Sequence, residues 1–193
     1  MDWTLFQHVN DFQQRTGWAH GVMRDYAKYG VVIFAGFLLV AGLMSLRQTP
    51  RALARTLWAA GAALVALALN QPIANAVDRA RPYTNHPNVH VLIAKGTDPS
   101  FMSDHSLIAG AVAAGLCFVS LRLGIVAGVA ALFMAFARVY VGAHYPGDVL
   151  AGLAFGAVIA AIGVPLADRA LAPIIERITA TSIGRRFVTY ESI

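Results

Sequence analysis

The chain has 193 residues, enough for one compact domain, and a formal net charge of +5. Hydrophobic residues make up 58% of it and charged residues 13%, too few charges to cover the surface of an ordinary soluble domain, so a lipid bilayer is the predicted solvent. The basic residues stand singly or in pairs between apolar runs, which argues against a nucleic-acid binder.

The first 28 residues predict an amphipathic segment that lies along the membrane surface. Apolar side chains such as Phe6, Val9 and Trp18 recur at helical spacings among charged and amide side chains. Gly17 is expected to break this segment into two short helices. A further membrane crossing by these residues is the alternative.

Five apolar runs follow and predict an all-α membrane bundle of five transmembrane helices. They cover residues 29–46, 56–77, 106–121, 123–137 and 149–167. The second and fifth runs can span the hydrocarbon core by themselves, whereas the third and fourth need their polar end residues to reach that length. Residues 1–193 are therefore interpreted as a single membrane domain.

The placement of arginine predicts the orientation of the bundle. With five spans, the connections after the first and third runs and the segment after the fifth fall on one side of the membrane. The arginines of these segments are Arg47, Arg51, Arg55, Arg122, Arg169, Arg177, Arg185 and Arg186. The positive-inside rule makes this side cytoplasmic, with a cytoplasmic tail at residues 170–193. The loops at residues 78–103 and 140–148 then share the outer face.

These two outer loops hold most of the residues that could carry chemistry. Ser103 suits the N-cap of the helix that follows, with Asp104 and His105 in its first turn. Pro146 suits the first turn of the fifth helix, just after His144. Two helix N-termini would then face one pocket, where free amide groups and positive dipole ends attract an anion.

Two arginines strengthen the case for an anion site. The guanidinium groups of Arg81 and Arg138 match the geometry of phosphate oxygens. Taken alone, an arginine at the end of a membrane helix usually snorkels to the interface, and a first-turn Ser or Asp usually only caps. The conjunction of two Arg, two His, Ser and Asp on one membrane face favours a phosphate site.

At these positions the chain resembles the type-2 phosphatidic acid phosphatase superfamily. That family has the motifs Lys-x6-Arg-Pro, Pro-Ser-Gly-His and Ser-Arg-x5-His-x3-Asp. The corresponding stretches here are Ala74-x6-Arg81-Pro82, Met102-Ser103-Asp104-His105 and Ala137-Arg138-x5-His144-x3-Asp148. Residues 70–82, 100–106 and 144–150 are similar to the bacitracin-resistance branch of undecaprenyl pyrophosphate phosphatases. The likeness covers most of the chain and fades after Arg169.

The resemblance implies a role for each matched residue. His144 would be the nucleophile that forms a phosphohistidine, and Asp148 would hydrogen-bond its other ring nitrogen. His105 would act as general acid and then as general base. The implied phosphate-binding residues are Arg81, Arg138, Ser103 and Asp104. Because arginines and amides can supply the positive charge that phosphoryl transfer needs, no metal and no cofactor is expected.

Three departures from the family motifs matter. Ala74 stands in place of the family lysine, which removes one phosphate-binding cation, and Arg79 is a candidate accessory residue nearby. Asp104 replaces the usual glycine, a form similar to the bacitracin-resistance branch, and Ala137 replaces an accessory serine. None of these changes removes a residue assigned to bond making.

The implied activity is hydrolysis of undecaprenyl pyrophosphate to undecaprenyl phosphate at the outer face of a bacterial cytoplasmic membrane, where cell-wall synthesis releases that lipid. A phosphatase of phosphatidate or phosphatidylglycerol phosphate, or a lipid phosphotransferase, is an alternative that the motifs do not separate. The expected partners are the polyprenyl pyrophosphate substrate and membrane lipids, and the oligomeric state stays open.

Two other interpretations are weaker. A non-enzymatic transport or assembly protein gives no reason for His105 and His144 to occur together, and no apolar run carries an ionisable residue at mid-depth. A metal site made of His86, His90 and Asp98 with His105 fits no tight ligand spacing.

Overall fold

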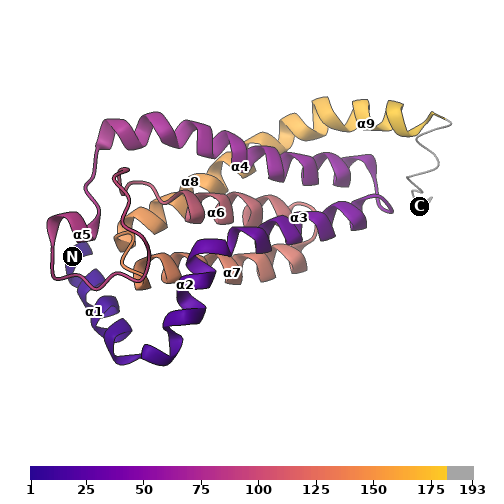
Figure 1. Ribbon diagram of the computed structural model, residues 1–193. Helices are drawn as coiled ribbons and strands as arrows, with labels where there is room; N and C mark the ends of the chain where they lie inside the picture. Colours follow the sequence, from indigo (N-terminus) through magenta and orange to yellow (C-terminus); the bar gives the residue numbers. More distant parts are fainter. Residues whose placement is uncertain (182–193) are drawn as a thin grey trace.

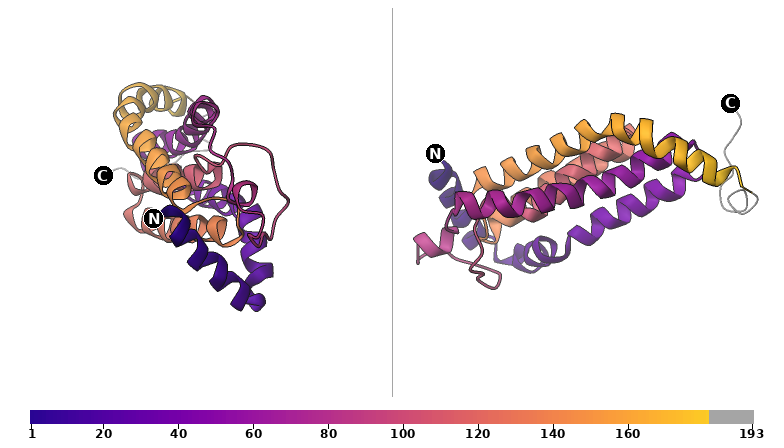
Figure 2. Two further views of the ribbon diagram at one scale, coloured as in Figure 1. Left: turned by 90° about the vertical axis from the view of Figure 1, so that its left-hand side faces the viewer. Right: turned by 90° about the horizontal axis from the view of Figure 1, so that it is seen from above.

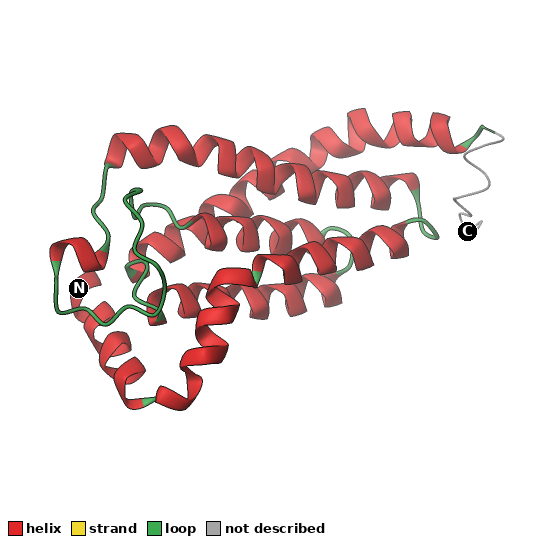
Figure 3. Ribbon diagram, viewed as in Figure 1, coloured by secondary structure: helices red, strands yellow, loops and turns green. Residues whose placement is uncertain are grey.

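The computed structural model describes residues 1–181, and this part of the chain consists of helices and loops (Figure 3). The N-terminal portion contains α1 (Asp2–Arg15), the short 3-10 helix η1 (Gly17–Ala19) and α2 (His20–Tyr29). The break between α1 and α2 falls at Thr16–Ala19, so the predicted division near Gly17 is confirmed.

Five longer helices form the bundle. They are α3 (Val31–Ser45), α4 (Pro50–Val77), α6 (Asp104–Cys117), α7 (Leu121–Tyr140) and α8 (Pro146–Leu166). The four-residue helix α5 (Pro82–Asn85) lies in the long loop between α4 and α6. Helix α8 continues through the π-helical turn η2 (Ala167–Leu171) into α9 (Ala172–Thr179).

The bundle is elongated, and its two ends differ (Figures 1 and 2). Helix α6 lies among α3, α4, α7 and α8 and contacts all four. Helices α1 and α2 and the loop around α5 lie at one end, while α9 extends at the other (Figure 1). The loops that the sequence predicts to share one face, residues 78–103 and 140–148, do meet at the α1 end.

Close packing of α6 against α8 positions the starts of both helices. A Cβ atom added to Gly152 of α8 would lie 2.8 Å from the carbonyl oxygen of Ser103, and one added to Gly156 would overlap the carbonyl of Leu107. Small residues of this kind let membrane helices approach closely. The backbone N–H of Ser103 also donates to the carbonyl of Asp148 at 3.2 Å. The N-termini of α6 and α8 are therefore held side by side.

The predicted helix starts at this end are confirmed. Ser103 is the N-cap residue of α6, and Asp104 and His105 are the first two residues of that helix. Pro146 is the first residue of α8.

The predicted number of five membrane spans is too high. Within residues 1–181, three helical stretches are long and apolar enough to cross a membrane: Pro50–Asn85, Leu121–Tyr140 and Pro146–Thr179. A fourth is possible if Gly17–Tyr29 and Val31–Ser45, which are bent by 58° relative to each other, count as one broken span. Helix α6 has only 14 residues, and at 1.5 Å per residue it is shorter than the roughly 30 Å hydrocarbon core. The chain is thus an all-helical, multi-pass membrane protein with three or four candidate spans.

The first part of the predicted cytoplasmic tail, residues 170–193, is helical. It comprises the end of η2 and the helix α9, which follow α8 without a loop. Arg185 and Arg186, which belong to that predicted tail, lie outside the described residues.

Candidate active site

His144 lies at the centre of the candidate site, in the short loop between α7 and α8. Its side chain is buried, with 2% relative exposure for the residue as a whole. Atom Nδ1 lies 2.8 Å from the backbone carbonyl oxygen of Ser100. Because a carbonyl oxygen only accepts hydrogen bonds, this contact places the ring proton on Nδ1. The lone pair of Nε2 is therefore available on the opposite side of the ring.

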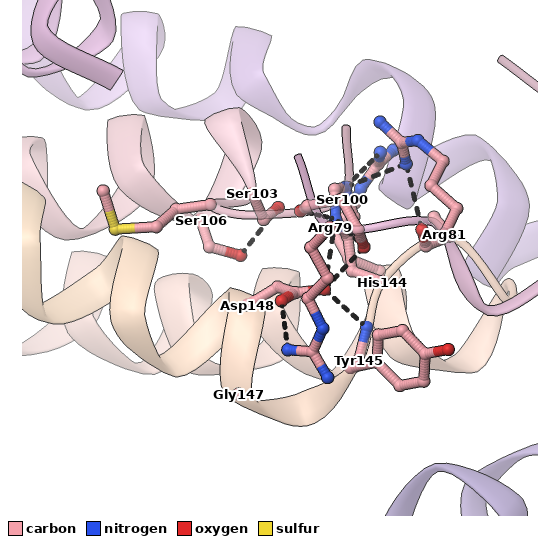
Figure 4. Close-up of polar contacts among 12 residues, drawn as sticks. Arg79, Arg81, Ser100, Ser103, Ser106, His144, Tyr145, Gly147 and Asp148 are labelled. Carbon is pink, nitrogen blue, oxygen red and sulfur yellow. Dashed lines mark hydrogen bonds and ion pairs between the residues drawn. The ribbon is translucent and has the colours of Figure 1, made fainter. Parts of the chain in front are cut away.

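Two guanidinium groups face Nε2 of His144, and Figure 4 labels that of Arg81. Nη2 of Arg138 lies 3.1 Å from it and Nη1 of Arg81 lies 3.3 Å from it. Burial, followed by the positive charges of Arg138 and Arg81, lowers the pKa of His144 well below 6.5. The imidazole is therefore neutral at pH 7, as a nucleophile requires.

Arg138 is a buried cation with an unused donor. Its Nη1 donates to the carbonyl of Ala27 in α2 at 3.1 Å. Within residues 1–181, its Nε is the buried side-chain nitrogen or oxygen that has no hydrogen-bond partner. Buried polar groups are normally paired, so an unpaired guanidinium donor here is consistent with a site that receives an anion.

A pocket of about 200 Å³ opens beside His144. Its lining includes Arg81, Arg138, Asp104 and His105, so both histidines and both arginines predicted for the site reach one cavity. An imidazole lone pair, two guanidinium groups and a second imidazole around one cavity can position a phosphoryl group, stabilise its charge and move a proton.

Asp148 supports His144 through Ser100 rather than by a direct hydrogen bond. Its nearest carboxylate oxygen is 4.0 Å from Nδ1 of His144, which is beyond hydrogen-bond range. The same oxygen accepts a 2.5 Å hydrogen bond from the Ser100 hydroxyl and a 3.0 Å bond from the backbone N–H of Tyr145. The direct Asp148–His144 hydrogen bond expected from the motif is thus replaced by a bridge through Ser100, visible in Figure 4.

Comparison with known proteins agrees with this arrangement. The model of the PAP2 superfamily matches residues 55–171, which is more than half of the chain. The chain belongs to the PAP2 superfamily. The matched segment contains all the arginines and histidines of the pocket.

Two relatives of the PAP2 protein are similar over most of its length. Undecaprenyl-diphosphatase BcrC of Bacillus subtilis is 28% identical over 159 residues, covering 82% of this chain and 80% of that protein. Undecaprenyl-diphosphatase of Sulfolobus acidocaldarius is 29% identical over 163 residues, covering 84% and 76%. A crystal structure of a PAP2-type phosphatidylglycerolphosphate phosphatase from Bacillus subtilis superimposes with a TM-score of 0.47 and 19% identity, over 88% of this chain and 95% of that one.

Ser103, which was predicted to bind phosphate, and Arg79, the candidate accessory residue, both lie outside the pocket. The hydroxyl of Ser103 is fully buried and lies 3.3 Å from the hydroxyl of Ser106. Arg79 donates to Asp148 at 2.7 Å and to Asp2 at 2.6 Å, and its guanidinium stacks over the ring of Tyr145 at 4.1 Å. Neither side chain lines the cavity, so Arg79 does not take the place of the family lysine there.

The wall of the pocket formed by α4 is polar but uncharged. Its lining residues are Asn70, Gln71, Ala74 and Asn75. Asn70 holds the start of α6, because its amide donates to Asp104 at 2.7 Å and to the carbonyl of Met102 at 3.0 Å. Sequence reasoning did not assign this role to Asn70, although a buried asparagine within an apolar helix is a signal for a required hydrogen bond.

Asp98, considered in the sequence only as part of a weakly supported metal site, contacts Arg81. Its carboxylate accepts a 2.5 Å hydrogen bond from Nη2 of Arg81, and its backbone carbonyl accepts one from Nε of the same arginine at 3.0 Å. The Asp98 side chain is 67% exposed, whereas that of Arg81 is 9% exposed. An exposed carboxylate thus covers one edge of a guanidinium group that faces the pocket.

The loop histidines lie on the contact between this loop and α1. His86 stacks on Trp3 with ring centroids 3.5 Å apart, and Nδ1 of His90 lies 2.9 Å from the side-chain oxygen of Gln13. No group of three or more His, Cys, Asp or Glu side chains within residues 1–181 is arranged to hold a metal ion. Independence from metal ions stays a prediction.

Proposed function

We propose that this PAP2 protein hydrolyses undecaprenyl diphosphate to undecaprenyl phosphate and inorganic phosphate through a phosphohistidine. The observation that carries the proposal is the position of Nε2 of His144, a neutral nucleophile facing Arg81 and Arg138 in a cavity that His105 also lines. The choice of lipid is supported by two relatives named undecaprenyl-diphosphatases, each of which aligns with more than three quarters of the chain.

In the first step, the lone pair of His144 Nε2 attacks the terminal phosphorus of the diphosphate. A P–N bond forms and the bond from that phosphorus to the bridging oxygen breaks. The leaving undecaprenyl phosphate takes a proton from His105, whose protonated form is stabilised by the negative charge of the bound diphosphate. Arg81 and Arg138 stabilise the charge on the phosphoryl oxygens. The Nδ1–H bond to Ser100 keeps the developing imidazolium oriented while Asp148 provides negative charge 4.0 Å away.

In the second step, water attacks the phosphohistidine. His105, which is neutral after it has protonated the leaving group, accepts a proton from the water. The P–N bond breaks and inorganic phosphate leaves. The electron pair of the P–N bond returns to Nε2, which regenerates neutral His144.

We further propose that the site faces the outside of a bacterial cytoplasmic membrane. The support is the distribution of exposed arginines at the end of the bundle opposite the pocket: Arg47 lies in the connection before α4, and Arg51 and Arg122 lie in the first turns of α4 and α7. Short loops rich in arginine remain on the cytoplasmic side. A diphosphate headgroup at the pocket would then have its lipid tail among the bundle helices.

The test of the activity is phosphate release by detergent-purified protein in the presence of a chelator. Undecaprenyl diphosphate, phosphatidate and phosphatidylglycerol phosphate serve as substrates. We expect the diphosphate to be preferred and His144→Ala to lower its turnover at least about a thousandfold, the scale seen when a nucleophile is removed. Brief mixing with a substrate labelled in the terminal phosphate should leave acid-labile label on the protein.

Three outcomes would change the proposal. Preference for a glycerophospholipid keeps the site and refutes the lipid assignment. Loss of activity with chelator, restored by a divalent cation, refutes metal independence. Full activity in His144→Ala refutes the nucleophile.

The orientation is tested by labelling intact cells with a membrane-impermeant maleimide. Cys117 is the single cysteine of the chain, so Cys117→Ala gives a background into which Asn88→Cys and Gln48→Cys are placed separately. Asn88 lies at the pocket end and Gln48 in the connection between α3 and α4. We expect label on the Asn88 variant only; label on the Gln48 variant only reverses the orientation.

A further inference from the structure

A second, larger cavity adjoins the phosphate pocket on the side of α2. Its volume is about 500 Å³. It shares His105 and Arg138 with the first pocket. The remaining lining comes from the second half of α2 and from the loop before Gly96, and consists of Arg24, Asp25, Lys28, Tyr29, Leu92, Ile93 and Ala94. A ligand that occupies both cavities must pass the His105–Arg138 pair.

The bend between α2 and α3 fixes this wall against the catalytic groups. The helices on the two sides of Gly30 are bent by 58° relative to each other, and the N–H of Gly30 donates to the carbonyl of Tyr26 at 2.8 Å. The carbonyl of Ala27, the residue before Lys28, accepts from Nη1 of Arg138 at 3.1 Å. The position of Lys28 is thus tied, through the neighbouring Ala27, to Arg138, which lines both cavities.

The second cavity carries the cations that the α4 side of the first pocket lacks. Arg24 pairs with its neighbour Asp25 at 3.1 Å, so much of its charge is compensated. The ammonium of Lys28 lies over the ring of Tyr29 at 4.9 Å, and within residues 1–181 it forms no ion pair with a carboxylate at 4.0 Å or less. Lys28 is therefore the cation best placed to meet an anion beyond His105.

We propose that the second cavity binds the leaving half of the substrate, with the lipid-linked phosphate at Lys28 and the first part of the lipid chain along Leu92 and Ile93. This inference rests on the proposed function, in which His105 protonates the bridging oxygen. Nucleophile, phosphorus and leaving oxygen lie roughly in line in phosphoryl transfer. With the phosphoryl group between His144 and His105, the leaving group points past His105 into the second cavity.

A specificity follows from this arrangement. A prenyl diphosphate places its second phosphate, which gains negative charge as the bond breaks, next to the ammonium of Lys28. A prenyl monophosphate places only an alcohol oxygen and hydrocarbon there. Lys28 therefore selects the diphosphate over the monophosphate, and acts on the transition state as well as on binding.

The test compares farnesyl diphosphate with farnesyl phosphate, which share one lipid chain and differ by one phosphate. The chain has two lysines, Lys28 and Lys95, and Lys95 lies on the same end of the protein, over the ring of Tyr83 at 5.7 Å and outside the second cavity. We expect Lys28→Gln to lower the ratio of kcat/KM for diphosphate to monophosphate about tenfold, the equivalent of 1.4 kcal/mol. Lys28→Arg should recover most of the ratio, and Lys95→Gln should leave it at the wild-type value.

Each remaining outcome decides the question. An unchanged ratio in Lys28→Gln, or an equal fall for both substrates, overturns the inference, since a lysine that only stabilises the end of α2 or the position of Arg138 would affect both alike. If Lys95→Gln lowers the diphosphate-to-monophosphate ratio of kcat/KM as much as Lys28→Gln does, the inference is also overturned. The fall would then come from the loss of any positive charge at this end of the protein. If the wild-type protein hydrolyses neither prenyl phosphate nor undecaprenyl diphosphate, the proposed function itself fails, a result separate from any change in the ratio.

Discussion

The backbone carbonyl oxygen of Ser100 lies 2.8 Å from Nδ1 of His144, closer to the ring than any carboxylate oxygen of Asp148. The hydroxyl of the same serine donates to Asp148 at 2.5 Å. Ser100 therefore orients the proposed nucleophile with its backbone and the supporting carboxylate with its side chain. The two functions can be separated, because a substitution of the side chain leaves the carbonyl in place.

Ser100→Ala is expected to lower kcat about tenfold and to change KM little. The carbonyl still fixes the tautomer of His144, but Asp148 loses one of the hydrogen bonds that orient it, and buried hydrogen bonds to charged groups contribute about 1.5–3 kcal/mol. Ser45→Ala is the matched control, since Ser45 is also buried and bonds Thr56 at 2.9 Å, within α3 and α4. A loss of kcat as large as that of His144→Ala would show instead that the whole loop has moved.

The depressed pKa of His144 predicts a dependence of stability on pH. Burial and the two arginines lower the pKa of the folded state below 6.5, so below pH 6.5 the unfolded chain binds a proton that the folded protein does not. Stability is therefore lost as the pH falls below about 6.5, by at most about 1.4 kcal/mol per pH unit for this group. Thermal unfolding in detergent from pH 7.5 to 5.0 should show a steeper fall for wild type than for His144→Gln.

The lowered pKa of His144 also predicts that the enzyme stays active at acidic pH. The acid limb of kcat/KM reports the pKa of the essential base in the free enzyme, so half-maximal activity on the acid side should lie below pH 6.5. A midpoint at or above pH 6.5, or equal pH slopes of unfolding in wild type and His144→Gln, would contradict a buried neutral His144.

The starts of the helices and the arginines that line the pocket could be predicted from the sequence, because each follows from local chemistry. Ser103 before an apolar run is a cap, and Pro146 belongs in a first turn, so the positions of His105 and His144 followed from helical geometry. Arg81 and Arg138 were predicted as anion ligands from residue type, and both reach the cavity. Their roles in catalysis stay predictions until activity is measured.

Other features depend on tertiary contacts that the sequence does not contain. Hydropathy marks α6 as apolar but not as a short helix enclosed by four others, which is why five spans were expected and three or four are found. The Ser100 bridge arises from a long loop that folds back onto α8. Arg79 was a candidate phosphate-binding residue because it lies near Ala74, the position of the family lysine. In the structure, its guanidinium group instead forms ion pairs with Asp2 and Asp148.

Removal of Arg79 is expected to reduce both stability and turnover. The Asp148 side chain is fully buried, and Arg79 supplies its nearest cation at 2.7 Å. Breaking a buried ion pair costs about 3–5 kcal/mol, and the 32% exposure of Arg79 reduces this to about 2 kcal/mol. Arg79→Gln should therefore lower the midpoint of thermal unfolding more than Asp2→Asn, while Arg15→Gln, an exposed change on α1, should leave it within error. The reverse order would place the main role of Arg79 in docking α1.

The contact between Asp98 and Arg81 predicts that this aspartate competes with the substrate phosphate. A carboxylate and a phosphate use the same edge of a guanidinium group, and here the exposed Asp98 side chain occupies it at 2.5 Å. Asp98→Asn removes the negative charge with little change in shape. Because an exposed ion pair contributes up to about 1 kcal/mol, inhibition by orthovanadate, a phosphate analogue, should become about fivefold tighter.

The control for this change is Asp78→Asn, which removes one negative charge from the same end of the bundle. Asp78 has a φ of 43°, in the left-handed region that asparagine also tolerates. Among the described residues it forms no ion pair with Arg81, whose paired carboxylate is that of Asp98. If both variants tighten inhibition equally, the effect is one of net charge at the pocket. If Asp98→Asn weakens inhibition, Asp98 orients Arg81 toward the phosphate, because loss of its charge would then release the guanidinium from the conformation that reaches His144.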